Sequence, residues 1–130
     1  MDLKNALTHA VMQPATAKTA NWNSSVIDLQ QFQGVVAVIL NAGAKTAGDA
    51  GDTTLDVRLY AGAESNGANA VIINQNFSQV TTVNSYQVIG LDSRSLNSAQ
   101  RYVKAVAVIA GTNSPSFPVS MGIVGKKQNQ

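Results

Sequence analysis

The sequence contains few side chains that could catalyse a reaction. The single histidine, His9, lies near the start of the sequence, and there is no cysteine. Catalysis by a Cys–His or Ser–His–Asp arrangement needs a histidine within hydrogen-bond reach of its nucleophile, so His9 would have to be the base. No GxSxG motif is present, and the segment around His9 is predicted to be a mobile arm. We therefore expect that the protein is not an enzyme.

The acidic residues offer no better arrangement. Paired-carboxylate catalysis needs two acidic groups that rigid elements hold in one pocket. Asp49, Asp52 and Asp56 are close in sequence, but the first two lie in a Gly- and Ala-rich loop over residues 41–52. Their spacing does not match the EF-hand pattern, and no Walker-type phosphate loop is present. Asp49 and Asp52 could make a weak calcium contact or be solvated loop residues; we favour the second hypothesis and expect no cofactor and no metal site.

Charged residues are sparse. Asp, Glu, Lys and Arg make up 12% of the 130 residues, about half of the usual share of roughly 25%. The net charge is +2, and the one local basic cluster is Lys126–Lys127, so we expect no nucleic-acid partner. A surface of Ser, Thr, Asn and Gln is weakly hydrated and weakly repulsive, which suits permanent packing against other protein. Many small β-domains have the same composition, so this alternative stays open.

No targeting or membrane-spanning segment is predicted. The N-terminal MDLKNALTHAVMQ lacks the basic start and the continuous apolar run of a signal peptide. The longest apolar run, residues 35–40, is far shorter than the roughly 20 residues that span a bilayer. We therefore expect synthesis in the cytoplasm and no membrane association.

From about residue 22 onward, alternating apolar residues and turn signals predict short strands. Residues 54–60 alternate cleanly, with Leu55, Val57 and Leu59 facing the core. Residues 34–40 are apolar on both faces, which predicts a central strand that is covered on each side. About seven or eight strands without intervening helices predict an all-β, antiparallel β-sandwich of jelly-roll or Ig-like type.

We predict three regions: an N-terminal arm over 1–21, the sandwich over 22–125, and a basic polar tail over 126–130. In the arm, five apolar residues follow helical spacing: Leu3, Ala6, Leu7, Ala10 and Val11. Pro14 would end such a helix, and an isolated helix of about ten residues is marginal in water. The arm is therefore expected to be extended or partly helical. It is either a frayed terminus or a segment that docks on a neighbouring subunit, and we favour docking because a solvated tail does not need this apolar stripe.

Several segments between Val26 and Val124 share a recurring pattern. They are Asp28-Leu-Gln-Gln-Phe32 running into Val35–Val38, then Leu55–Tyr60, then Gln100-Arg-Tyr-Val-Lys-Ala-Val106, and finally Gly111-Thr112 through Gly125-Lys126-Lys127. In this order and spacing the chain resembles a group of small structural proteins of tailed-phage virions. The turn usual in that group is replaced by AGAESNG at residues 61–67, and the tryptophan that often follows it is absent.

The resemblance implies a virion component, and we expect a capsid decoration or cement protein on the outer surface of the phage head. Its partners would be the major capsid protein and neighbouring copies of itself in a homo-oligomer. Such a protein stabilises the shell by bridging capsid subunits, because it buries interface only on the assembled particle. Many symmetric copies multiply a modest contact.

Two alternatives remain. A head–tail connector or tail component would differ in copy number. A carbohydrate-binding β-sandwich is less favoured, because such modules present several exposed aromatic residues and aromatics make up only 5% of this chain. Trp22 either anchors the arm in an interface pocket or closes the end of the core. As partner contacts we predict Leu3, Leu7, Val11 and Trp22 of the arm, with Asp49 and Asp52 of the long loop.

Overall fold

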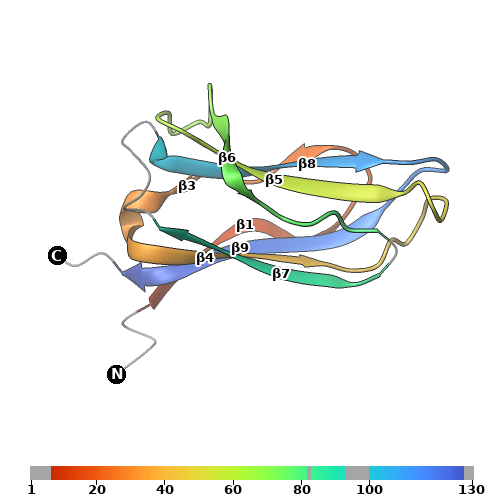
Figure 1. Ribbon diagram of the computed structural model, residues 1–130, viewed down its shortest axis with the longest axis horizontal. Coiled ribbons are helices and arrows are strands. Elements are labelled where there is room, and N and C mark those ends of the chain that lie inside the picture. The colour runs from red at the N-terminus through yellow and green to blue at the C-terminus, as the bar shows by residue number, and fades with distance from the viewer. Residues whose placement is uncertain (1–6, 82, 93–99, 128–130) are drawn as a thin grey trace.

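The computed structural model describes residues 7–81, 83–92 and 100–127, and these residues form a β-sandwich (Figure 1). Its elements are β1 (Leu7–Lys18), β2 (Trp22–Asn23), β3 (Ile27–Asp28), the 3-10 helix η1 (Leu29–Gln31), β4 (Phe32–Ala42), β5 (Thr54–Gly62), β6 (Val71–Asn76), β7 (Ser85–Asp92), β8 (Tyr102–Ala110) and β9 (Phe117–Lys127). The predicted all-β class is confirmed. Within these ranges no helix is long and apolar enough to cross a membrane.

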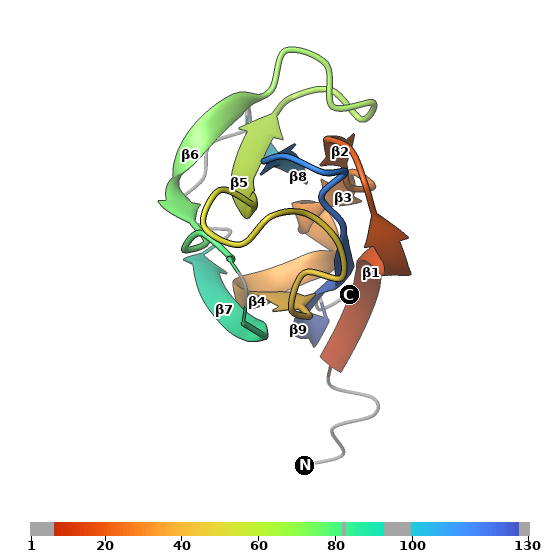
Figure 2. The same ribbon diagram turned by 90° about the vertical axis from the view of Figure 1, so that its right-hand side faces the viewer.

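Two antiparallel sheets make up the sandwich. The four-stranded sheet has the order β1-β9-β4-β7; the five-stranded sheet has the order β2-β8-β5-β6, with β3 also pairing with β8. The end view shows the two layers, with β6 and β7 at one side and β1 and β2 at the other (Figure 2). The described part of the chain has nine strands rather than seven or eight, because two-residue β2 and β3 follow each other along β8.

Alternation places one side of each strand in a single core. In β5 the predicted inward residues Leu55, Val57 and Leu59 are all buried, while Arg58 between them is exposed. The inward sides of β8 and β9 show the same alternation, and their buried residues are Val103, Ala105, Ala107, Phe117, Val119, Met121 and Ile123. Removing these side chains from water is the main source of stability for a cysteine-free chain of this size.

The described part of the predicted arm is a strand, and the helical alternative is wrong for it. Strand β1 pairs with β9 along its whole length, with irregularities on either side of Gln13. Met12 is 0% exposed and lies in the core, whereas Val11 beside it is 56% exposed. Pairing with β9 satisfies the backbone groups that a short isolated helix could not keep paired in water, and Pro14 lies within the irregular stretch, where a missing donor is tolerated. Leu3 lies outside the described residues.

Strand β9 is an interior strand, although Pro118 favours an edge position. It lies between β1 and β4. Pro118 is its second residue, and its carbonyl oxygen accepts the backbone N–H of Gly43 at 2.8 Å, one position beyond the last β4 pair, so the donor that proline lacks falls at the end of the ladder. At the other end, Lys126 and Lys127 are the last two residues of β9, so this part of the predicted tail belongs to the sheet.

An ion pair joins Asp28, the last residue of β3, to Arg101, the residue before β8. The Asp28 carboxylate accepts hydrogen bonds from Arg101 Nε at 2.9 Å and from Arg101 Nη2 at 2.7 Å. It also accepts the backbone N–H of Gln30 at 2.9 Å and thereby caps η1. The hydrogen bond from Arg101 lowers the pKa of Asp28 below its ordinary value. Two of the segments that carry the phage resemblance therefore meet here, in a structural role.

We expect Asp28→Asn to lower the free energy of unfolding by roughly 0.5 to 1 kcal/mol at neutral pH, because the pair is partly exposed and screened by solvent. The folded-state pKa of Asp28 is lowered, so its contribution is present above the unfolded-state pKa of about 3.9 and is lost as pH falls through the lower folded-state value. Urea unfolding at pH 7 measures the loss of stability, and urea unfolding in acid measures how that loss depends on pH. Asp56→Asn, which removes a carboxylate bonded only to the exposed Gln79 amide, should show a smaller loss; equal losses would contradict the assigned role.

Candidate contact surface

The structure places the residues considered for catalysis in different elements of the fold. His9 lies exposed on β1, paired with Val124 of β9. Across the described ranges no group of three or more His, Asp or Glu side chains could hold a metal ion. What the fold assembles instead are two loop carboxylates, a buried tryptophan, a cleft between sheet edges and a broad apolar sheet face.

Asp49 and Asp52 tie two loops together at one end of the sandwich. Thr112 Oγ1 lies 2.8 Å from Oδ2 of each carboxylate and can donate to one of them at a time. Asn113 Nδ2 donates to Asp49 Oδ1 at 2.6 Å, and these bonds lower the pKa of Asp49, the Asn113 bond most. The carboxylates thus brace the β4–β5 loop against the β8–β9 loop, and contact with a partner through them stays a prediction.

Trp22 lies in the core rather than on the surface. Its side chain is 8% exposed, and its backbone pairs with Ala107. The ammonium of Lys18 lies 5.5 Å from the centre of the indole ring. A large ring at this position fills the side of the sandwich where β2 lies near β1, so we do not count Trp22 among the surface contacts.

The central strand β4 is covered on one side only, contrary to the prediction from its continuous apolar run. Val36, Val38 and Leu40 point into the core and are buried. Val35 on the opposite side is 57% exposed, and Ile39 is only half-buried. A strand that is apolar on both faces normally has both faces buried. Within the described residues, the core covers one face of β4 and the opposite face is left uncovered.

The uncovered side of β4 continues across the whole four-stranded sheet, and we call this surface the outer face. The register of the pairings aligns its residues in transverse rows. From β1 to β7, one row is Val11, Gly122, Ile39 and Val88, and the next is His9, Val124, Ala37 and Gly90. Toward one end lie the pairs Leu7–Lys126 and Val35–Asp92, and toward the other end lie Ser120, Asn41 and Tyr86. The two middle rows contain no Asp, Glu, Lys or Arg.

Gly122 lies at a hollow in the outer face. Gly122 has no side chain between Val11 and Ile39, and a hollow of about 520 Å³ lies there, also bordered by Pro14 and Ala15. A Cβ at Gly122 would make an ordinary contact, 3.5 Å from the Ala10 carbonyl oxygen, so the fold does not itself require glycine at this position.

The outer side of the five-stranded sheet differs in charge. Asp56 and Arg58 project from β5, and Lys104 projects from the neighbouring β8. Charged groups in these central strands make burial against another protein costly unless each is paired. The outer face of the four-stranded sheet is therefore the better contact surface of the two.

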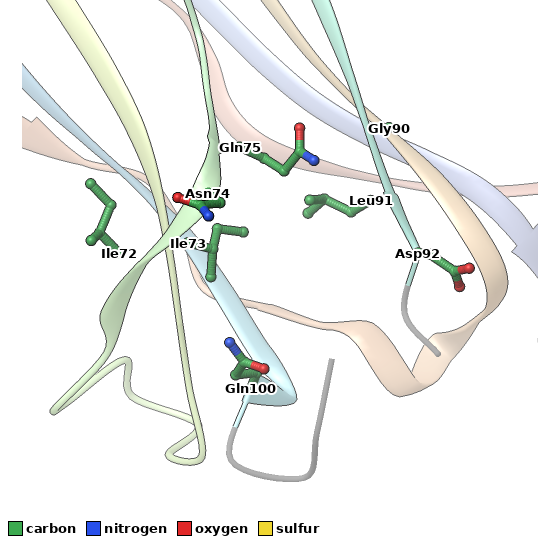
Figure 3. A pocket seen from close by; sticks show the side chains of 8 residues that line it. All are labelled: Ile72, Ile73, Asn74, Gln75, Gly90, Leu91, Asp92 and Gln100. Carbon is green, nitrogen blue, oxygen red and sulfur yellow. The ribbon is translucent and has the colours of Figure 1, made fainter. Parts of the chain in front are cut away.

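A second concave site lies between the sheet edges β6 and β7 (Figure 3). It has a volume of about 480 Å³, and Ile73 and Leu91 face each other across it. Asn74 and Gln75 supply amide groups from β6. This lining could hydrogen-bond a polar ligand, but none of the seven aromatic side chains lines it, so a stacking platform is absent.

The structure brings together some predicted contacts and adds others. Leu7 and Val11 lie on the outer face, while Asp49 and Asp52 lie in the loop at the end of the sandwich and Trp22 is buried. Sequence reasoning missed Val35, Ile39 and Val88 as contact candidates. The signal was available in the uninterrupted apolar run of β4, which was assigned entirely to the core.

No protein-family model matches the chain, and no curated protein matches it. Among solved structures, the SPBc2 prophage-derived protein YomS is similar at 12% identity and a TM-score of 0.46, over 88% of this chain and 92% of that one. The CBM22-1 xylan-binding domain of Paenibacillus barcinonensis Xyn10C is similar at 11% identity and a TM-score of 0.44, over 96% and 88%. A chain of the T13 IBDV viral particle is similar at 14% identity and 0.41, over 92% and 28%. These values are too low to assign a family or a function.

Proposed function

We propose that the protein is a non-enzymatic structural component of a phage virion, a decoration or cement protein on the outer surface of the head, made in the host cytoplasm. The observation that carries the contact role is the uncovered apolar outer face. Val11, Val35 and Val88 are each more than half exposed, on three different strands. Exposed apolar surface that is continuous over a sheet marks an interaction site in a folded protein.

The placement in a virion rests on the sequence resemblance. The strand order adds support at the level of architecture. If β2 and β3 are two halves of one interrupted strand, the sheets follow the orders 1-8-3-6 and 2-7-4-5, which is the arrangement of a jelly roll. Viral capsid domains and lectins both use this architecture, so it favours the virion and the carbohydrate alternative equally.

The carbohydrate alternative is the weaker one on side-chain grounds. Trp22 and the three phenylalanines are buried, and Tyr86 is the single aromatic residue on the outer face. Sugar-binding sandwiches need aromatic rings that stack on the sugar. The amide-lined cleft of Figure 3 is the place where a sugar would bind if that alternative held.

The copy number on purified particles tests the proposed function. We expect hundreds of copies per particle, because a cement protein repeats over the shell, and we expect particles that lack the protein to lose their genome at a lower temperature. Quantitative mass spectrometry against the major capsid protein measures the first, and a dye-release melt measures the second. About a dozen copies would assign the protein to the connector or tail, and absence from particles would overturn the virion role.

A further inference from the structure

We infer that the outer face pairs with the same face of a second copy of the chain, about a two-fold axis that runs along the strands between β4 and β9. This inference names the occupant of the contact surface and rests on the proposed contact role. The four-stranded sheet has the order β1-β9-β4-β7. Rotation about this axis therefore lays β4 over β9 of the second copy, and β7 over β1 of the second copy, while each transverse row faces itself.

The side chains that would then meet are complementary in size. In one middle row, Ile39 of one copy faces the hollow at Gly122 of the other, because these residues are partners across β4 and β9. In the next row, Val124 faces Ala37. A large residue thus meets a small one at both levels next to the axis, as close packing between two sheets requires.

The same rotation matches the outer strands and the charges. His9 of β1 faces Gly90 of β7, so again a large residue meets one without a side chain. Lys126 of β9 and Asp92 of β7 lie at the same end of the face. Because β9 faces β4 of the second copy and β7 lies beside that strand, each Lys126 comes next to the Asp92 of the other copy. Opposite charges at an interface margin fix the register of the pair.

The size of the face limits the expected affinity. Four strands about 4.8 Å apart and seven residues of about 3.4 Å each span roughly 19 Å by 24 Å. The pair would bury on the order of 1,000 Å² in total, close to the lower end of roughly 1,200 Å² for stable interfaces. We therefore expect a dissociation constant in the micromolar range, strengthened on a particle by repetition. The pair leaves the β4–β5 loop of each copy free, so Asp49 and Asp52 stay the predicted contacts with neighbouring shell subunits.

The test is sedimentation of the whole chain from about 1 to 500 µM, a range that brackets a micromolar dissociation constant. We expect a reversible monomer–dimer equilibrium, with a dimer of twice the 13.6 kDa chain mass. Ile39→Ala removes the protruding side chain and Gly122→Ile fills the hollow; each should weaken the dimer about tenfold or more. The double variant exchanges the two sizes and should recover most of the lost affinity. Val108→Ala, at an exposed valine of the other sheet, should change nothing.

Other outcomes would overturn the pairing, the proposed function or both. A monomer at every concentration, a trimer, or a dimer that tolerates both single substitutions would exclude this pairing. If the Ile39→Ala, Gly122→Ile double variant is folded by circular dichroism but does not recover the dimer affinity, the two-fold register is excluded. If the chain is monomeric but the Ile39 and Gly122 variants are lost from particles, the occupant is a shell protein; the proposed function then stands and the pairing fails. A chain that dimerises as described but is absent from particles would support the pairing and overturn the proposed function.

Discussion

A chain with Val88→Lys is expected to fold as the wild type does and to be at least about 100-fold depleted from particles. Val88 is 52% exposed on β7, so a lysine there costs the free chain less than about 0.5 kcal/mol. When the outer face is covered, the same ammonium is buried among aliphatic side chains without a partner, which costs several kcal/mol. Copies per capsid subunit, measured by mass spectrometry of purified particles, give the depletion.

Val108→Lys is the matched control for this substitution. Val108 is 45% exposed on β8, in the five-stranded sheet, and is also a strand valine in a largely solvated position. The Val108→Lys chain should be incorporated into particles at the wild-type level. Thermal melts of both variants separate loss of contact from loss of folding. Incorporation of the Val88→Lys chain at the wild-type level would show that the outer face does not take part in assembly.

The second large effect is on stability, at the strand that the sequence pattern predicted to be an arm. Met12→Ala is expected to lower the free energy of unfolding by about 3 kcal/mol, because a fully buried side chain leaves a cavity. Val11→Ala, one residue earlier and pointing outward, should cost less than about 0.5 kcal/mol. Urea unfolding of the two variants measures the difference between inward and outward positions on β1.

The contrast between these neighbours decides what the N-terminal segment is. A loose or helical arm would make both substitutions harmless to folding, so equal small losses would contradict the strand. The pairing of β1 with β9 also changes the meaning of a truncation. Deleting residues 1–20 would uncover the side of β9 and part of the core, so loss of particle binding after such a deletion would report unfolding instead of a lost contact.

The sequence predicted most strands but misjudged two of them for identifiable reasons. In β1, Leu7 and Val11 are four residues apart, and this spacing places both on one face of a helix and on one face of a strand alike. Only the burial of Met12 separates the two structures. In β4, the apolar run predicted cover on both faces, and a periodicity argument could not show that the described chain covers only one of them.

The apolar run of β4 indicated one strand of the outer face, but the way the four strands combine into that face depends on pairings between distant residues. Gly122 is a neighbour of Ile39 only through the register of β9 and β4. The link between Asp28 and Arg101 spans 73 residues in the same way. Local patterns contain periodicity and turns, whereas the order of strands in a sheet follows from packing of the whole core.

We claim that the outer face of the four-stranded sheet is covered by protein in the assembled state. Electron cryomicroscopy of native particles, at a resolution that places the sandwich and its β4 and β9 strands, tests it directly. We expect density of a second copy over Val11, Ile39 and Val88, with those side chains excluded from solvent. A sandwich whose outer face looks into open solvent, while another surface contacts the particle, would contradict the claim.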